Sequence, residues 1–275
     1  MKKSSSQAKE ILKVGRFLIP YRIYGDKGLQ IVCINGVQQS MAMWQSFIAR
    51  FSDEHRIVLF DFPNQGKGKI VSGDKQVSLP EQVDILKAIL HKAGADNDVI
   101  LCAASWGGVV AVDFAAKYPT RIKVLVLASL GTRPNKKMVE TIKKGASINM
   151  NNREQMAEVL IKSFGEDLPA RFKQRIVSQF RAMEEENLRS FYEHGLFVIS
   201  SKNLSELVDL KRIKARTILL NGEKDKIIDM ADARFLAAQI PGCEMIVVKG
   251  VGHFLHLEDE KVLGIYENIL ASINN

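Results

Sequence analysis

The sequence lacks the cysteine, histidine and glycine patterns that hold metal ions or nucleotide phosphates. It has no paired Cys-x-x-Cys, no His-Glu-x-x-His and no Gly-x-x-x-x-Gly-Lys-Ser/Thr segment, and Gly66-Lys67-Gly68 lacks the rest of a dinucleotide-binding fingerprint. The three cysteines, Cys33, Cys102 and Cys243, are an odd number without metal-ligand spacing, and they lie in or beside apolar runs. We therefore expect no cofactor and no metal, and we expect buried thiols in a reducing compartment.

Long apolar runs and blocks of like charge are also missing. No apolar stretch reaches the length of a signal peptide or a membrane-spanning helix, so we expect a soluble, cytoplasmic protein without a membrane span. Lysine and arginine outnumber aspartate and glutamate by 39 to 31, a net charge of +8, but no basic stripe is interleaved with aromatic residues. This pattern indicates a solvated basic surface rather than nucleic-acid binding.

What the sequence does contain is a regular alternation of apolar strands and helical patterns. A hairpin is expected first, from residues 11–14 and 17–24 on either side of Gly15. Continuous apolar runs at 30–35, 56–61, 99–104 and 122–130 then alternate with helical spacing at 41–51, 79–93 and 106–118. Because the strands are apolar throughout, both of their faces must be covered. The pattern predicts an α/β fold, in which a mostly parallel twisted sheet carries helices on both faces.

The alternation is interrupted once. Residues 131–215 contain no convincing strand and indicate several helices, for example at 138–144, 153–164 and 169–192. Strands and helices alternate again from 217 to 273. We therefore predict a core formed by residues 1–130 and 216–275, with residues 131–215 as an all-helical cap inserted after the sixth strand.

The most informative segment is Ala103-Ala104-Ser105-Trp106-Gly107-Gly108, between a buried strand and a helix of small residues. A sharp strand-to-helix turn with serine at its tip is the nucleophile turn of the pattern Gly-x-Ser-x-Gly. Here Ala103 replaces the first glycine and Gly107 keeps the second. The alternative is that Ser105 is an ordinary helix N-cap.

Two further positions extend this interpretation. Asp225 follows one predicted strand and His253 follows the last, which is the chain order serine, acid, histidine. An imidazole can take the serine proton and return it to a leaving group, and a carboxylate fixes the tautomer of the ring. Glu223 is the alternative acid. The backbone N–H groups of Val37 and Trp106 are the expected donors to the anionic intermediate, and His55, His91, His194 and His256 are expected to be structural.

The chain resembles the α/β-hydrolases over nearly its whole length. The resemblance is carried by four segments, at residues 34–36 (ING), 59–66 (LFDFPNQG), 105–108 (SWGG) and 252–258 (GHFLHLE). Within that superfamily it is most similar to the 3-hydroxyacyl acyltransferases of the rhamnolipid-precursor and polyhydroxyalkanoate-precursor type. Those enzymes also have Asn-Gly in place of His-Gly, an Ala-Ser-Trp-Gly-Gly turn and a segment like 168–171 (LPAR) in the cap.

The resemblance implies a small-molecule acyl ester or thioester substrate, with a 3-hydroxyacyl group carried on acyl carrier protein or coenzyme A and transferred through Ser105. Both donors are anionic, and the cap has 16 basic and 11 acidic side chains, a net charge of +5. We expect its apolar positions to line an acyl pocket. The residues expected to contact substrate are Asn35, Phe164, Phe180, Phe197 and Phe254.

Three other functions remain open at this stage. A plain esterase shares most of these segments. A lactonase or a hydrolase of C–C bonds would use the same triad. A ligand receptor built on the same fold would turn over slowly or not at all.

Overall fold

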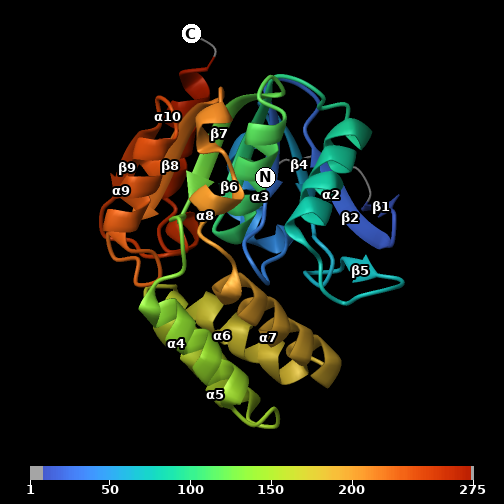
Figure 1. Ribbon diagram of the computed structural model, residues 1–275, viewed down its shortest axis with the longest axis vertical. Coiled ribbons are helices and arrows are strands. Elements are labelled where there is room, and N and C mark those ends of the chain that lie inside the picture. The colour runs from blue at the N-terminus through green and yellow to red at the C-terminus, as the bar shows by residue number, and fades with distance from the viewer. Residues whose placement is uncertain (1–8, 274–275) are drawn as a thin grey trace.

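The protein is described here by a computed structural model that covers residues 9–273. A nine-stranded sheet runs through its centre, in the order β1-β2-β4-β3-β6-β7-β8-β9, with β5 paired to β2 (Figure 1). The strands are β1 (Glu10–Val14), β2 (Phe17–Tyr24), β3 (Gln30–Ile34), β4 (Arg56–Phe60), β5 (Lys69–Ile70), β6 (Val99–Ala104), β7 (Ile122–Ala128), β8 (Arg216–Gly222) and β9 (Glu244–Val248).

The predicted N-terminal hairpin and parallel sheet are both confirmed. β1, β2 and β4 pair antiparallel, and the pairs from β4 through β3, β6, β7 and β8 to β9 are parallel. Every residue of β6 is buried. The side chains of Leu101 and Ala103 belong to one apolar cluster and those of Ile100 and Cys102 to another. Both faces of the sheet are therefore covered, as the unbroken apolar strands require.

Helices cover the two faces of the sheet. α2 (Leu79–Lys92), α3 (Trp106–Lys117) and α9 (Met230–Gln239) contribute to the first apolar cluster, and α1 (Gln45–Phe51) and α10 (Val262–Ala271) contribute to the second. α2 begins at a capping box, in which Ser78 and Glu81 each bond the other's backbone N–H. The three cysteines are free thiols, with Cys33 and Cys102 buried between the layers.

Four helices form the cap at one end of the sheet (Figure 1). They are α4 (Lys136–Ser147), α5 (Arg153–Phe164), α6 (Ala170–Ala182) and α7 (Glu185–Ser200). They have an apolar cluster of their own, formed around Met156, Phe180, Leu188 and Tyr192. None of the helices within residues 9–273 has the length and apolar composition needed to cross a bilayer.

The limits of the cap differ from the prediction in two respects. The insertion follows the seventh strand and not the sixth. The prediction missed β5, whose two residues pair with Phe17 and Leu18 and are too few to give a sequence pattern. The last part of the predicted insert also packs on the core. Leu204 in α8 (Leu204–Leu207) and Leu210 in the 3-10 helix η2 (Leu210–Arg212) are buried in the cluster of the sheet. Residues 1–8 and 274–275 of the predicted core lie outside the described residues.

Candidate active site

Ser105 occupies a strained turn between β6 and α3. Its backbone angles are φ 48° and ψ −122°, in a region that L-residues rarely adopt. The Ser105 N–H donates to the carbonyl of Ala128 (2.8 Å), and the Ser105 carbonyl accepts from the N–H of Gly108 (2.7 Å). The hydroxyl makes no capping hydrogen bond to α3, so Ser105 does not act as an ordinary N-cap. The backbone thus holds the side chain away from its own helix.

The small residues of the turn are needed because α3 lies directly against β3. A Cβ atom added at Gly107 would lie 2.5 Å from the carbonyl oxygen of Asn35 and 2.9 Å from that of Ile34. Neither is a flexible side chain that could move aside. Ala103, in place of the usual first glycine, is buried in the sheet and keeps its Cβ without disrupting the turn.

Gly107→Ala should therefore destabilise the fold by about 1–3 kcal/mol, the usual effect of overpacking a rigid site. Urea unfolding would measure the change. Gly264→Ala is the matched control, because a Cβ at Gly264 in α10 meets no atom within 4 Å. Alanine there should stabilise the protein by roughly 0.5–1 kcal/mol. Equal effects at the two positions would show that the packing of the turn is not tight.

His253 and Asp225 form a buried pair beyond the ends of β9 and β8. The Nδ1 atom of His253 lies 2.9 Å from Oδ2 of Asp225, and both side chains are at most 5% exposed. The other oxygen of Asp225 accepts from the N–H groups of Ile227 (2.8 Å) and Ile228 (3.1 Å). The alternative acid, Glu223, instead accepts from the N–H of Gly250. The structure therefore brings Asp225, not Glu223, to the histidine.

The pair sets the charge of both groups. Burial acts to raise the pKa of Asp225, but the charge and hydrogen bond of His253 and the two N–H groups outweigh it and hold the pKa below its usual 3.8. Burial acts to lower the pKa of His253, and the Asp225 carboxylate outweighs it and raises the pKa above 6.5. An ionised carboxylate can only accept, so Nδ1 of the neutral ring carries the proton and Nε2 is left as the base.

Ser105 and His253 line one cavity of about 240 Å³ beneath the cap. Most of its wall is apolar, and α5 and α6 contribute eight of the residues that line it. The sequence-predicted residues that line it are Ser105, His253, Val37, Phe164, Phe180 and Phe254. As expected for apolar positions of the cap, Leu160, Ile161, Phe172 and Ile176 line it too. Phe164 and Phe254 both pack edge-on to the His253 ring.

Two predicted substrate contacts lie elsewhere. The Asn35 side chain is buried, where Nδ2 donates to the carbonyl of Phe60 (2.9 Å) and Oδ1 accepts from the indole N–H of Trp44 (2.9 Å). Asn35 therefore ties the end of β3 to its neighbours and does not face the cavity. Phe197 packs edge-on to Trp106, 5.5 Å between ring centroids, and lines a second cavity.

The two candidate oxyanion donors flank Ser105. Within residues 9–273, the N–H groups of Val37 and Trp106 bond no other protein group. The turn before Val37 is held because the Gly36 N–H donates to the Gln39 side chain and the Gln39 N–H donates back to the Gly36 carbonyl. The indole N–H of Trp106 donates to Gln82 (2.9 Å). Both N–H groups are thus available to an anion.

Sequence reasoning gave no role to Glu258, which holds the loop of His253, and expected His256 to be structural. Glu258 accepts from the N–H groups of Gly252 and Phe254, on either side of the histidine, and so clamps that loop. His256 is buried, stacks on Trp44 at 5.4 Å and lies 3.2 Å from the carbonyl of Met43. The segment 252–258 carried the family resemblance, and that was the one signal for these contacts.

Comparisons with known proteins agree with this geometry. The family model for the alpha/beta hydrolase fold matches residues 30–260. The chain is 25% identical over 271 residues to proline iminopeptidase PfmaB of Pestalotiopsis fici, covering 90% of this chain and 94% of that protein. It is 23% identical over 242 residues to a (R)-3-hydroxydecanoyl-ACP:CoA transacylase of Pseudomonas putida, covering 87% and 81%.

Among solved structures, the chain superposes on MGS-M2, an alpha/beta hydrolase enzyme from a deep-sea metagenome library of the Medee basin. The TM-score is 0.80 at 22% identity, covering 94% of this chain and 97% of that one. The resemblance predicted from the four segments is confirmed. The chain belongs to the α/β-hydrolase family.

Proposed function

We propose that this protein cleaves an acyl ester or thioester through a covalent acyl intermediate on Ser105. The observation that carries the proposal is the cavity shared by Ser105 and His253, in which His253 is held by the buried Asp225 carboxylate. The strained turn presents a serine hydroxyl to the cavity that His253 also lines, and no protein group among residues 9–273 bonds Nε2 of the imidazole. These are the parts that activate a weak nucleophile.

The reaction would proceed in two halves. Oγ of Ser105 attacks the acyl carbon while Nε2 of His253 takes the hydroxyl proton, and the N–H groups of Val37 and Trp106 bind the oxyanion. The intermediate collapses when the bond to the leaving oxygen or sulfur breaks and His253 returns the proton to that atom. Water or another hydroxyl or thiol then gives its proton to Nε2 of His253 and attacks the acyl carbon. The bond between that carbon and Oγ breaks, and His253 returns the proton to Oγ of Ser105.

The apolar walls of α5 and α6 support an acyl chain as the occupant of the cavity. Phe164, Phe172 and Ile176 lie there with Leu160 and Phe180, and burial of an alkyl chain against such side chains is favourable. Among the described residues that line this cavity, Arg175 is the one lysine or arginine.

Transfer to a carrier, rather than to water, is supported by the transacylase relative and by the charge of the cap. The cap helix α4 carries four lysines, Lys136, Lys137, Lys143 and Lys144. Their positive charge would attract an anionic acyl donor, such as the acyl carrier protein in the name of the transacylase relative.

Product analysis tests the proposal. A p-nitrophenyl acyl ester should give a burst of nitrophenol and then steady turnover. A 3-hydroxyacyl group on acyl carrier protein or coenzyme A should yield free acid if the enzyme is a hydrolase and a new acyl conjugate if it is a transferase. If neither the ester nor the thioester donors were cleaved, the proposal would be contradicted, and a receptor, a lactonase or a C–C bond hydrolase would be favoured.

The triple replacement of Lys136, Lys137 and Lys144 by glutamate should lower kcat/KM for a carrier-linked donor about tenfold at low salt, because steering by a charged surface raises the encounter rate. The loss should shrink as salt screens the charges. The kcat/KM for a p-nitrophenyl ester should not change, because this substrate is uncharged and is not attracted by the lysines. The matched control reverses Lys13, Lys92 and Lys123, three exposed lysines of the core. Equal losses of kcat/KM in both triple variants would show that the effect comes from the net charge of the protein and not from the cap.

A further inference from the structure

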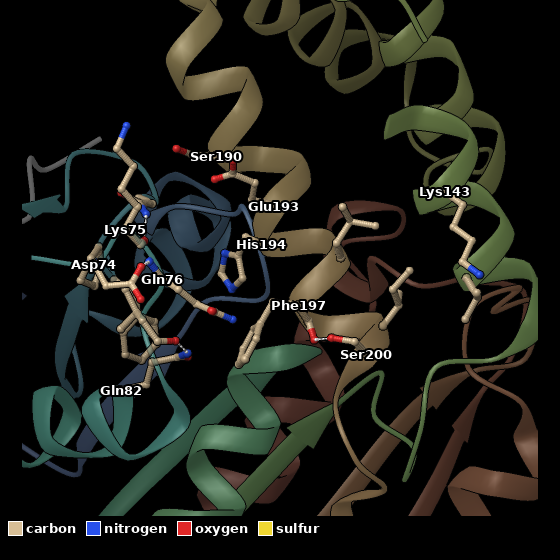
Figure 2. Close-up of a pocket in the computed structure, with 17 residues that line it drawn as sticks. Asp74, Lys75, Gln76, Gln82, Lys143, Ser190, Glu193, His194, Phe197 and Ser200 are labelled. Atoms are coloured by element: carbon tan, nitrogen blue, oxygen red, sulfur yellow. Dashed lines mark hydrogen bonds between the residues drawn. The ribbon is translucent and has the colours of Figure 1, made fainter. Parts of the chain in front are cut away.

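A second cavity, of about 690 Å³, lies beside the one that holds Ser105. Its wall is formed by residues 62–64 and 74–77, by Gln82 of α2, by helix α7 and by two side chains of α4 (Figure 2). On one side, the ammonium group of Lys75 pairs with Glu186 of α7 (2.7 Å), which joins the core loop to the cap. No residue of the proposed triad lines this cavity. Its wall shares no residue with the cavity of Ser105, so it is a separate compartment with room for another part of a substrate.

One side-chain contact connects the two cavities, and a second joins the second cavity to the residue that follows Ser105. Gln38 lines the cavity of Ser105, and its Nε2 lies 3.2 Å from Nδ1 of His194, which lines the second cavity. Phe197, also in the second cavity, packs on Trp106. Gln38 follows Val37, so each contact adjoins one candidate oxyanion donor. Gln38 itself has φ 58°, a strained conformation that the surrounding structure must maintain.

The hydrogen-bonding groups of the second cavity are suited to a neutral partner. Burial lowers the pKa of His194 to about 4, so the ring is neutral at physiological pH. The Gln38 amide nitrogen donates to Nδ1, which leaves Nε2–H of His194 as a donor. The cavity has two acidic side chains, Asp74 and Glu193, and two basic ones, Lys75 and Lys143, so it has no excess charge.

Other polar groups there are free to bind. Within the described residues, the side-chain amide of Gln76 and the hydroxyl of Ser190 have no hydrogen-bond partner. Figure 2 shows Gln76 extending from the core loop towards His194 and Phe197 on α7. The wall therefore combines an apolar surface, to which Phe62 and Phe197 contribute, with unpaired donors and acceptors.

We infer that this second cavity binds the part of the alcohol or thiol side of the substrate that lies next to the reacting bond, which is neutral and carries hydroxyl or amide groups. The inference rests on the proposed acyl transfer and divides the substrate between two compartments. The acyl chain occupies the apolar cavity under α5 and α6. The moiety on the other side of the reacting bond passes the Gln38–His194 pair and bonds Gln76, Ser190 and His194.

The test compares donors that share one acyl chain and differ in the other half of the molecule. The glycerol monoester carries hydroxyl groups, the pantetheine thioester carries two amides and two hydroxyl groups, and the ethyl ester and ethyl thioester carry neither. The measured quantity is the ratio of kcat/KM for each polar donor to that for its ethyl counterpart. A higher ratio for the glycerol ester would identify a hydroxyl-bearing moiety, and a higher ratio for the pantetheine thioester would identify an amide-bearing one.

Ser190→Trp should lower the higher ratio at least about tenfold, because the indole fills the space that the polar moiety needs. Asn187→Trp, on the exposed surface of α7 and outside the cavity, is the matched control and should leave the ratio unchanged. The milder pair Gln76→Leu and Ser190→Ala removes hydrogen-bonding groups without filling the space, and should lower the ratio about threefold. This pair tests the inference if the Ser190→Trp variant does not fold.

Two failures are distinguishable. If the unmodified enzyme cleaves none of these donors, the proposed acyl chemistry is wrong. If it cleaves them but the ratios stay near one, or if the cavity variants change polar and ethyl donors equally, the second cavity does not bind the alcohol or thiol side.

Discussion

Ser105→Ala should abolish turnover while the protein stays folded. Loss of the nucleophile in such a triad lowers kcat on the order of 10⁶-fold, because the imidazole and the carboxylate then have no bond to activate. Steady-state hydrolysis of a p-nitrophenyl ester measures the loss. Mass spectrometry after a brief reaction measures a second effect, since the acyl adduct on the wild-type chain should be absent from the variant.

The fold should tolerate this change for a local reason. The Ser105 hydroxyl makes no capping hydrogen bond, and alanine meets the same strain at φ 48° as serine does. The free energy of unfolding should therefore shift by less than about 1 kcal/mol. Ser147→Ala, the same replacement on the exposed end of α4, is the control for activity. Activity in Ser105→Ala within tenfold of the wild type would mean that another residue is the nucleophile.

The sheet could be predicted because its strands give an unambiguous local signal. The buried strands β3, β4, β6 and β7 are continuous apolar runs, and their length and bounding residues distinguish them from helices. β5 could not be found, since its two residues are defined only by pairing with Phe17 and Leu18. Its pairing partner lies about fifty residues away in the chain, which no local pattern records.

The cap shows the same limit. One helix was predicted over 169–192, yet α6 ends at Ala182 and α7 begins at Glu185. The residues between are strong helix formers, so propensity indicates no break. The break coincides with a contact from another helix, where the Arg153 side chain in α5 donates to the carbonyl of Met183. Packing within the cap overrides the local preference.

At the site, chain order was informative and side-chain direction was not. Ser105, Asp225 and His253 each follow a strand, so the topology alone brings them to one edge of the sheet. Asn35 also follows a strand, but its amide turns inward to Trp44 and Phe60. Phe197 lies on a face of α7 that lines the second cavity, whereas Phe191 and Gly195 of the same helix line the cavity of Ser105, and the sequence does not distinguish these faces.

Asp225→Asn should lower kcat by roughly 10⁴-fold, the second-largest effect we expect. An asparagine amide can donate to Nδ1, which would leave the proton on Nε2 and remove the base that faces Ser105. Glu223→Gln is the matched control, because the same chemical change there affects a side chain that bonds the Gly250 N–H and not the histidine. A larger loss in Glu223→Gln than in Asp225→Asn would reverse the assignment of the acid.

The pH dependence separates this role from simple damage to the fold. His253 acts as a base only when neutral, and Asp225 raises the pKa of the ring above 6.5, so kcat/KM of the wild type should fall with acid through a value above 6.5. Without the carboxylate, burial is the dominant influence and lowers the pKa of His253. The residual activity of Asp225→Asn should then persist to more acidic pH than that of the wild type. A variant that lost activity only through misfolding would keep the wild-type pH limb at reduced amplitude, since the folded fraction would still contain the same histidine environment. An unchanged limb would therefore show that Asp225 does not control the protonation of His253, however large the loss of rate.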